Sequence, residues 1–215
     1  MTTIVLVDDH RIVRQGLKLL LEADPTFRIV GEASDGLQAV TLVRQLQPDV
    51  LVVDINIPSL NGIDVIRCVK SECPDVKAIM LTMHSSEDYV FSAFANGASA
   101  FVLKDSCVDD LVNAIHQALD GNRYLSPQLA DRALDNYLRT GRASASDPFE
   151  TLTQRERQVV QLSAEGYTHA EIGDRLHISP RTAETHRANA MHKLGLLNAT
   201  DLVRYAIRRG LVSVA

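Results

Sequence analysis

The feature that most constrains the fold of this 215-residue chain is an alternation of short apolar runs with stretches of helical periodicity through residue 119. Five runs have the length and composition of buried strands: residues 3–7, 28–33, 49–53, 77–82 and 100–103. Between the first runs, apolar residues recur at helical spacing, namely Ile12, Val13, Gly16, Leu17, Leu20 and Leu21, then Leu37, Val40, Val43 and Leu46. Strands that alternate with helices form parallel sheets. The sequence therefore predicts an α/β fold of five βα units.

Polar residues end four of these apolar runs. Asp8 and Asp9 follow the first run, Asp54 follows the third, Thr82 ends the fourth and Lys104 follows the fifth. The carboxyl ends of parallel strands meet in one crevice, so these side chains should lie together. One such carboxylate alone would indicate only a solvated strand end. Three carboxylates repel one another unless a cation intervenes, so the whole set indicates a binding or reactive site.

The residue types in this set suit phosphoryl chemistry. Asp54 stands alone after the most apolar strand, and a carboxylate can attack a phosphoryl group to form an aspartyl phosphate. Asp8 and Asp9 could hold a hard divalent cation, which offsets their repulsion and the charge of the phosphoryl oxygens. Lys104 supplies an ammonium and Thr82 a hydroxyl to the bound phosphate. His84, two residues after Thr82, is either a solvated loop residue or a modulator of dephosphorylation.

Charge is distributed unevenly along the chain. Apolar residues make up 46 % of it and the net charge is −5. In residues 149–215, Lys and Arg outnumber Asp and Glu by nine to seven, whereas acidic residues outnumber basic ones by twenty to thirteen in the remainder. The three cysteines lack CxxC spacing, which favours a reducing compartment. Without a leader or a long apolar run, we expect a soluble, cytoplasmic protein with no membrane partner.

The helical pattern changes after residue 119. Ser126-Pro127 can begin one connecting helix, and the small polar stretch Thr140–Pro148 is typical of a flexible linker. Four helical segments follow, each preceded by a polar capping residue: Thr153, Thr168, Ser179 and Asn198. Capping boxes are expected at Thr153 with Glu156 and at Thr168 with Glu171, and also at Ser85 with Asp88 and at Ser106 with Asp109. We predict a domain over residues 1–119, a linker over 120–147 and a helical domain over 148–213.

The second and third of these later helices have the layout of a helix-turn-helix over about residues 168–187, with a recognition helix over about 180–194. Such a helix can enter the major groove of DNA. Seven of its residues are candidate DNA contacts: Arg181, Thr182, Glu184, Thr185, Arg187, Ala188 and Lys193. From spacing alone, a four-helix interaction module with a solvated charged face is an equal alternative.

Motifs in the first part of the chain, over residues 2 to about 119, resemble those of response-regulator receiver domains. The matching motifs are Val7-Asp8-Asp9-His10, Val53-Asp54-Ile-Asn-Ile-Pro58, Leu81-Thr82 and Phe101-Val-Leu-Lys104-Asp105. The resemblance implies a flavodoxin-like (βα)5 fold with strand order 2-1-3-4-5, and phosphorylation of Asp54 by a sensor histidine kinase. It also implies Mg²⁺ or Mn²⁺ bound by Asp9, Asp54 and the carbonyl of Asn56, with Asp8 acting through water. Phe101 occupies the position of the family's switch aromatic.

Motifs in the last part of the chain, over about residues 148–213, resemble those of the LuxR-type DNA-binding domain. They include Leu152-Thr-Gln-Arg-Glu-Arg157, Ile178-Ser-Pro-Arg-Thr182, Thr185-His-Arg-Ala-Asn189 and Lys193-Leu-Gly195. Together the halves resemble a NarL/FixJ-type response regulator. This resemblance implies a homodimer on inverted or direct half-sites of promoter DNA, with RNA polymerase as a further candidate partner. Leu202, Ala206 and Ile207 in the last helix fit a dimer contact or the domain's own core equally well.

The sequence is best interpreted as a phosphorylation-switched, DNA-binding transcription regulator that is not an enzyme beyond autodephosphorylation. One alternative is a DNA-binding regulator that does not depend on phosphorylation. Another is an aspartyl-phosphate phosphohydrolase, which needs a second acid where this chain has Asn56. Dinucleotide binding is disfavoured because Asp8-Asp9-His10-Arg11 occupies the place of a glycine-rich phosphate turn.

Overall fold

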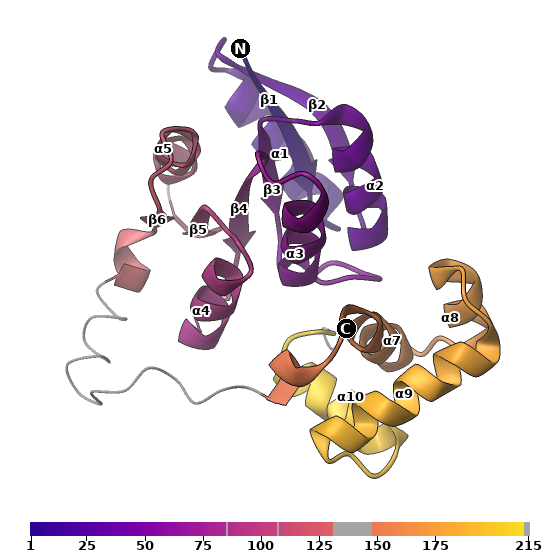
Figure 1. Ribbon diagram of the computed structural model, residues 1–215. Coiled ribbons are helices and arrows are strands. Elements are labelled where there is room, and N and C mark those ends of the chain that lie inside the picture. Colours follow the sequence, from indigo (N-terminus) through magenta and orange to yellow (C-terminus); the bar gives the residue numbers. More distant parts are fainter. Residues whose placement is uncertain (85, 107, 131–147, 213–215) are drawn as a thin grey trace. The chain divides into compact units, whose positions relative to one another are not determined.

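The computed structural model describes residues 1–84, 86–106, 108–130 and 148–212 (Figure 1). The described residues form two compact units, an α/β unit that runs to residue 130 and a helical unit that begins at residue 148. Most of the predicted linker and most of its helix lie at 131–147, outside the described residues. Residues 127–130 are helical, as Ser126-Pro127 predicts.

The α/β unit is built on one parallel sheet with strand order β2-β1-β3-β4-β5-β6. Its strands are β1 (Thr2–Val7), β2 (Phe27–Ala33), β3 (Val50–Val53), β4 (Lys77–Thr82), β5 (Ala100–Leu103) and β6 (Tyr124–Leu125). The predicted flavodoxin-like fold and the order of the first five strands are confirmed. Strand β6 was not predicted, because two residues are too few to show a strand pattern. Tyr124 and Ser126 donate backbone hydrogen bonds to Ser99 and Phe101, and these bonds fix the sixth strand.

Five helices cover the sheet: α1 (Arg11–Glu22), α2 (Gly36–Leu46), α3 (Gly62–Glu72), α4 (Glu87–Ala95) and α5 (Val108–Leu119). Leu21 of α1 and Ile115 of α5 join the core on one face, while α2, α3 and α4 pack on the other (Figure 1). Strands β3 and β5 are buried on both faces, which accounts for their continuous apolar runs.

Two expectations for these helices were wrong in detail. Ile12 and Leu20 of the predicted α1 stripe are 88 % and 47 % exposed, because α1 buries only the narrower face that contains Leu21. Helix α4 has Ser86 rather than Ser85 as its N-cap, so the expected capping box of Ser85 with Asp88 is wrong. The expected capping box of Ser106 with Asp109 depends on residue 107, which lies outside the described residues. Ser85 itself lies outside the described residues.

The second unit contains a short 3₁₀ turn, η1 (Pro148–Thr151), and the four expected helices: α7 (Gln154–Ala164), α8 (His169–Leu176), α9 (Pro180–Leu194) and α10 (Ala199–Arg208). Thr153 and Thr168 form the predicted capping boxes, and Ser179 and Asn198 cap the other two helices. The caps explain why such short helices begin where the sequence predicts.

The sequence left open whether Leu202, Ala206 and Ile207 belong to the core of this unit or to a dimer contact, and their burial distinguishes them. Leu202 and Ala206 of α10 are buried, and Ala206 packs in a cluster with Phe149, Val160 and Ala190. Ile207 is instead 39 % exposed. Leu202 and Ala206 therefore belong to the unit's own core, and Ile207 lies at the surface. Across the described parts of both units, no helix is long and apolar enough to span a bilayer.

Candidate functional site

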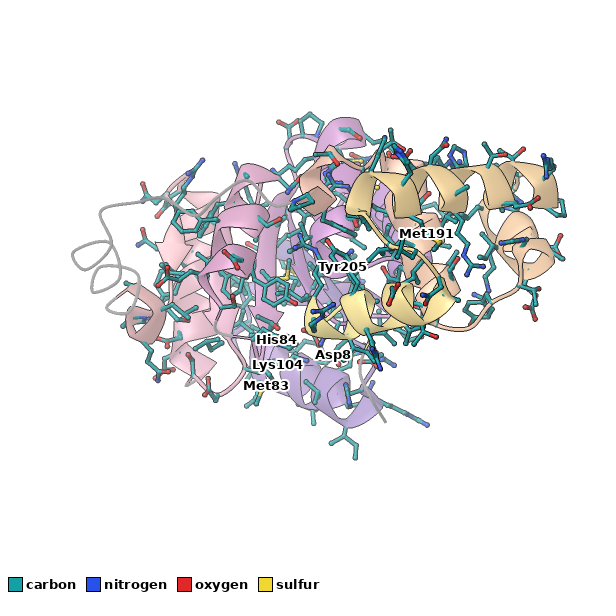
Figure 2. All side chains as sticks on the ribbon, turned by 90° about the horizontal axis from the view of Figure 1, so that it is seen from below. Asp8, Met83, His84, Lys104, Met191 and Tyr205 are labelled. Carbon is teal, nitrogen blue, oxygen red and sulfur yellow. The ribbon has the colours of Figure 1, made fainter. Side chains whose placement is uncertain are left out.

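The polar residues at the strand ends lie together at the carboxyl edge of the sheet, as predicted. Val7, before Asp8, pairs with Val53, before Asp54, and Thr82 pairs with Leu103, before Lys104. Figure 2 shows Asp8, Met83, His84 and Lys104 in one region of the molecule. The parallel register thus gathers residues that are up to about a hundred positions apart in the chain.

Lys104 forms the centre of this site. Its Nζ lies 2.6 Å from an oxygen of Asp8 and 2.6 Å from an oxygen of Asp54. Asp8 and Asp54 are buried, with 2 % and 6 % of their surfaces exposed. One ammonium thus links two buried carboxylates, and the remaining net negative charge leaves the site suited to a further cation.

The pKa shifts of Asp54 and Lys104 follow from this shared arrangement. Burial raises the pKa of Asp54, and the negative charge of Asp8 adds to the effect, while Lys104 opposes it. Burial acts to lower the pKa of Lys104, but the hydrogen bonds and charges of Asp54 and Asp8 outweigh it, so that this pKa is raised. Lys104 therefore stays charged. Keeping Asp54 ionised, in contrast, costs free energy in the folded state.

A group of possible metal ligands adjoins this pair. Asp9 is exposed, and its oxygen lies 2.7 Å from Nδ1 of His10, while the backbone N–H of His10 donates to Asp8 at 2.9 Å. One ligand atom from each of Asp8, Asp9 and His10 lies within 4.8 Å of the others. With Asp54 nearby, the donor set is rich in carboxylate oxygen, which suits a hard cation such as Mg²⁺ or Mn²⁺.

Thr82 and Phe101 are both completely buried, each with 0 % of its surface exposed. The Thr82 hydroxyl accepts a hydrogen bond from the backbone N–H of His84 at 3.2 Å. Phe101 is among the largest fully buried side chains of the described chain. The hydroxyl at the end of β4 is therefore held by the following loop, and the aromatic ring on β5 is packed inside the unit.

Gly62 was not among the predicted site residues. A Cβ atom at this position would approach the backbone oxygen of Asp54 to within 2.1 Å. The Gly62 N–H also donates to the oxygen of Ile55 at 2.9 Å, and Asn61 caps α3. The turn after β3 therefore packs directly against the backbone of Asp54. Asn61-Gly62 marks a turn in the sequence, but only the fold brings that turn against the carboxylate.

The candidate recognition helix is α9, which packs against α8 and α7. Six of the seven predicted contact residues are exposed on it, and Arg187 is half-buried; the exposed ones are Arg181, Thr182, Glu184, Thr185, Ala188 and Lys193. Ala183 and Ala190 face inward and are fully buried. Gly173 of α8 allows the close turn, since a Cβ there would lie 2.7 Å from the oxygen of Ile178. The structure therefore has the helix-turn-helix arrangement.

Several candidate DNA contacts already have partners within the unit. Arg181 pairs with Glu184 at 2.7 Å, and Nη1 of Arg187 lies 3.3 Å from Nε2 of His169. Lys193 pairs at 2.7 Å with the buried carboxylate of Glu156. Arg181 is 84 % exposed along its side chain, so it is the cation most available to a phosphate.

The Lys193–Glu156 pair gives a prediction for stability. Burial acts to raise the pKa of Glu156, but Lys193 and the Thr153 cap outweigh it, so the pKa is lowered. Because the pKa of Glu156 is lower in the folded chain than in the unfolded chain, its ionisation stabilises the unit at pH values above the unfolded pKa of a glutamate. This stabilisation is lost as the pH falls through the folded-state pKa of Glu156. We expect Lys193→Gln to lower the free energy of unfolding by about 1 kcal/mol at neutral pH, because the lysine is partly solvated.

Denaturant unfolding of the full chain at neutral pH and at acid pH measures this effect, with Lys18→Gln as a surface control. Lys18 pairs with Glu32 in the other unit, so its loss should leave unfolding of the helical unit unchanged. The difference between Lys193→Gln and the parent should shrink in acid. A difference that stays constant from neutral pH to acid would contradict the role of the ion pair.

Comparisons with known proteins match both units of the chain. Residues 4–116 match the response regulator receiver domain, and residues 150–206 match the luxR family of bacterial regulatory proteins. The chain is 37 % identical to the transcriptional regulatory protein MctR of Rhizobium johnstonii, across 98 % of this chain and 95 % of that one. It is 36 % identical to the transcriptional regulatory protein LiaR of Bacillus subtilis, across 99 % and 100 %.

A solved structure is also similar. It is RcsB from Salmonella enterica serovar Typhimurium, bound to promoter rprA in the presence of the phosphomimetic BeF₃⁻. The identity is 28 %, the TM-score is 0.60, and the match covers 95 % of this chain and 97 % of that one. The similarity thus spans both units, and the similar protein was solved bound to promoter DNA.

Proposed function

The chain belongs to the response regulators of two-component systems, with a receiver domain followed by a LuxR-type DNA-binding domain, and on this basis we propose that phosphorylation of Asp54 controls promoter binding by α9. A sensor histidine kinase is the proposed phosphoryl donor. The observation that carries the proposal is the Lys104 ammonium, which lies between the buried carboxylates of Asp8 and Asp54.

In this proposal an oxygen of Asp54 attacks the phosphorus atom of a phosphohistidine. The bond between phosphorus and the imidazole nitrogen breaks, and the nitrogen keeps the electron pair. Lys104 then transfers one of its contacts from the Asp54 carboxylate to a phosphoryl oxygen, where its positive charge stabilises the product. Burial of Asp54 excludes water and strengthens this interaction.

We propose that Asp9, Asp54 and the backbone carbonyl of Asn56 hold Mg²⁺ or Mn²⁺, with Asp8 contributing through water. The cation would neutralise charge on the transferring phosphoryl group. The carboxylate-rich donor set supports this assignment, since among the described residues the ammonium of Lys104 is the charge that faces the carboxylates of Asp8 and Asp54, while Asp9 lies beside the imidazole of His10.

The proposed switch uses Thr82 and Phe101. The phosphoryl group draws the Thr82 hydroxyl away from the N–H of His84, and the ring of Phe101 moves into the space that Thr82 leaves. Phosphorylation would thereby shift a pre-existing equilibrium rather than create a new fold. Phe101 has no hydroxyl, so this movement depends on packing alone.

For the second domain we propose binding of a homodimer to inverted or direct half-sites of promoter DNA. Arg181, Thr182, Arg187 and Lys193 would contact phosphates, and Glu184, Thr185 and Ala188 would face the bases. Contact with RNA polymerase and a cytoplasmic location follow from a role at promoters. The similarity to RcsB, which was solved on a promoter with BeF₃⁻, supports this part of the proposal.

DNA binding with and without beryllofluoride tests the switch. We expect the phosphate mimic to raise affinity for a selected oligonucleotide by about tenfold, a coupling of ordinary size. Arg181→Ala should weaken binding by roughly threefold to tenfold and lower its salt dependence, because one phosphate contact is lost. The matched control is Arg44→Ala, which removes an exposed arginine of the receiver domain and should leave DNA affinity unchanged.

Two other functions predict different results. A phosphorylation-independent regulator would bind DNA equally well with and without beryllofluoride. A phosphohydrolase would turn over phosphomonoesters, but Asn56 lacks the acid that such a reaction needs, and its side-chain nitrogen contacts His84. A response regulator with a DNA-binding domain acts through its own phosphorylation rather than by turnover of a substrate.

A further inference from the structure

Arg14, the fourth residue of α1, reaches back to the loop that carries Asp8 and Asp9. Its Nη1 donates a hydrogen bond to the backbone carbonyl of Asp8 at 2.5 Å, and its Nε donates to a carboxylate oxygen of Glu32 on β2 at 3.2 Å. Only 14 % of the Arg14 side chain is exposed. The planar guanidinium thus holds two acceptors at once, one on a strand and one on the backbone of the proposed metal site.

Glu32 restrains the guanidinium from the side of the sheet. It lies opposite Leu6 in the register of β1 and β2, and it also accepts hydrogen bonds from Gln15 and Lys18 of α1 at 3.0 Å each. The hydrogen bond from Lys18 lowers the pKa of Glu32, and Arg14 adds to this effect, while burial opposes it. Glu32 therefore stays ionised at neutral pH and holds Arg14 in place as a charged partner.

The backbone of Asp8 is held on both sides. Its N–H donates to the carbonyl of Ala33 at 3.2 Å, and its carbonyl accepts from Arg14. This carbonyl belongs to the planar peptide that joins Asp8 to Asp9, so its direction constrains the ψ torsion of Asp8 and the φ torsion of Asp9. Those torsions set the direction in which the Asp9 side chain leaves the backbone. Because Asp9 is exposed, this restraint on its backbone is important for the position of its carboxylate.

Helix α1 begins without the usual capping side chain. Within the described part of the chain, its N-cap residue His10 makes no capping hydrogen bond with its side chain, and the first turn contains no acidic residue. In α2 and α3, by contrast, the side chains of Asp35 and Asn61 accept hydrogen bonds from the first turn. Arg14 therefore supplies, from inside α1, a link between helix and loop that a capping side chain provides elsewhere.

Groups that lie behind a metal ligand orient it, and their loss weakens metal binding. We propose that Arg14 is a positioning residue for the divalent cation, because it fixes the Asp8 carbonyl and thereby the direction of the Asp9 carboxylate; the inference rests on the proposed binding of Mg²⁺ or Mn²⁺. Electrostatics alone predicts the opposite effect. A positive charge near the carboxylates repels a cation, so its removal should tighten binding. The two effects differ in sign, and a measured affinity separates them.

Binding of Mn²⁺ to the unphosphorylated full-length protein tests the proposal, with the unbound ion measured by electron paramagnetic resonance. We expect Arg14→Ala to bind Mn²⁺ roughly ten times more weakly than the parent, the usual size of a lost contact behind a metal ligand. Unchanged or tighter binding by Arg14→Ala would overturn the proposal. A parent protein that binds no Mn²⁺ would instead refute the cation site on which the inference rests, so the two failures are distinguishable.

Two variants separate positioning from the general docking of α1. Lys18→Ala removes a cation from the same helix and one bond to Glu32, but no bond to Asp8, so Mn²⁺ affinity should stay within about twofold of the parent. Glu32→Gln weakens the docking of α1 and leaves the donor of Arg14 free to bond the Asp8 carbonyl. It should unfold at lower denaturant, yet lose clearly less Mn²⁺ affinity than Arg14→Ala. Equal losses of affinity in Glu32→Gln and Arg14→Ala would overturn the proposal.

A second measurement needs no metal and uses the milder variant Arg14→Lys. This variant keeps the positive charge but has no planar fork to hold both acceptors. In NMR spectra of the full-length protein, the carbonyl carbon of Asp8 and the amide nitrogen of Asp9 should change their chemical shifts in Arg14→Lys and keep them in Lys18→Ala. An Asp8 carbonyl resonance that is the same in the parent and in Arg14→Lys would overturn the proposal. If Arg14→Ala does not fold, Arg14→Lys replaces it in the Mn²⁺ titration, again with weaker binding than the parent expected.

Discussion

Replacement of Asp54 by asparagine should reduce labelling by acetyl phosphate to background, a loss of at least roughly two orders of magnitude. The amide has nearly the shape of the carboxylate but is not a nucleophile towards phosphorus. The free energy of unfolding should stay the same or rise by about 1 kcal/mol, because the raised pKa of Asp54 shows that its charged form is held at a cost above the unfolded pKa. Denaturant unfolding and label incorporation, measured together, check both parts.

Asp75→Asn is the matched control for this experiment. Asp75 is exposed in the loop before β4, at the opposite edge of the sheet, so the same change of charge there should preserve labelling. Continued labelling of Asp54→Asn would show that another carboxylate accepts the phosphoryl group. If labelling is lost and promoter binding by Asp54→Asn still matches that of the phosphorylated parent, the phosphorylation-independent regulator becomes the better interpretation.

The largest expected effect on stability comes from Gly62→Ala. The added Cβ would approach the Asp54 oxygen to within 2.1 Å and the Asp54 carbonyl carbon to within 2.9 Å. These are backbone atoms of a buried strand end, so they cannot move aside as a flexible side chain could. We expect the free energy of unfolding to fall by about 3 kcal/mol or more, the cost of severe overpacking. Thermal or denaturant unfolding measures it.

Gly16→Ala provides the control for Gly62→Ala. Nothing lies within 4 Å of a Cβ at Gly16 in α1, and alanine favours a helix over glycine. This variant should be more stable than the parent by up to about 1 kcal/mol. Any folded Gly62→Ala protein should also accept less label, since the displaced backbone carries Asp54. Equal stability of the two variants would show that the turn after β3 can relax.

The accuracy of the sequence predictions differed according to how local the determining interactions were. The capping boxes at Thr153 and Thr168 were predicted correctly because both partners lie within three residues of each other. The strand β6 could not be predicted, since Tyr124 and Leu125 form a strand only by pairing with β5. Ile12 and Leu20 match a helical apolar pattern, yet α1 leaves them exposed because the width of the buried face depends on its neighbours.

In the candidate site, too, features that depend on local sequence were predicted and features that depend on tertiary contacts were not. The positions of Asp8, Asp54, Thr82 and Lys104 after apolar runs were enough to predict that they meet, because parallel strands share one carboxyl edge. The sequence did not indicate that Lys104 contacts two carboxylates or that Lys193 is paired with Glu156. Such pairings depend on side-chain directions and on distances across the fold.

The sequence by itself determined the two architectures, the helix starts at the polar caps of the second unit, and the motifs that identify the family, because repeating patterns and short motifs are local properties of a chain. The order of the five main strands came from the family resemblance that those motifs carry. The tertiary structure alone decided which side chains are partners. It placed Gly62 against the backbone of Asp54, joined Asn56 to His84, and put Leu202 and Ala206 into the core rather than on the surface. Each of these depends on the close approach of residues from different elements, which packing fixes and a one-dimensional pattern does not contain.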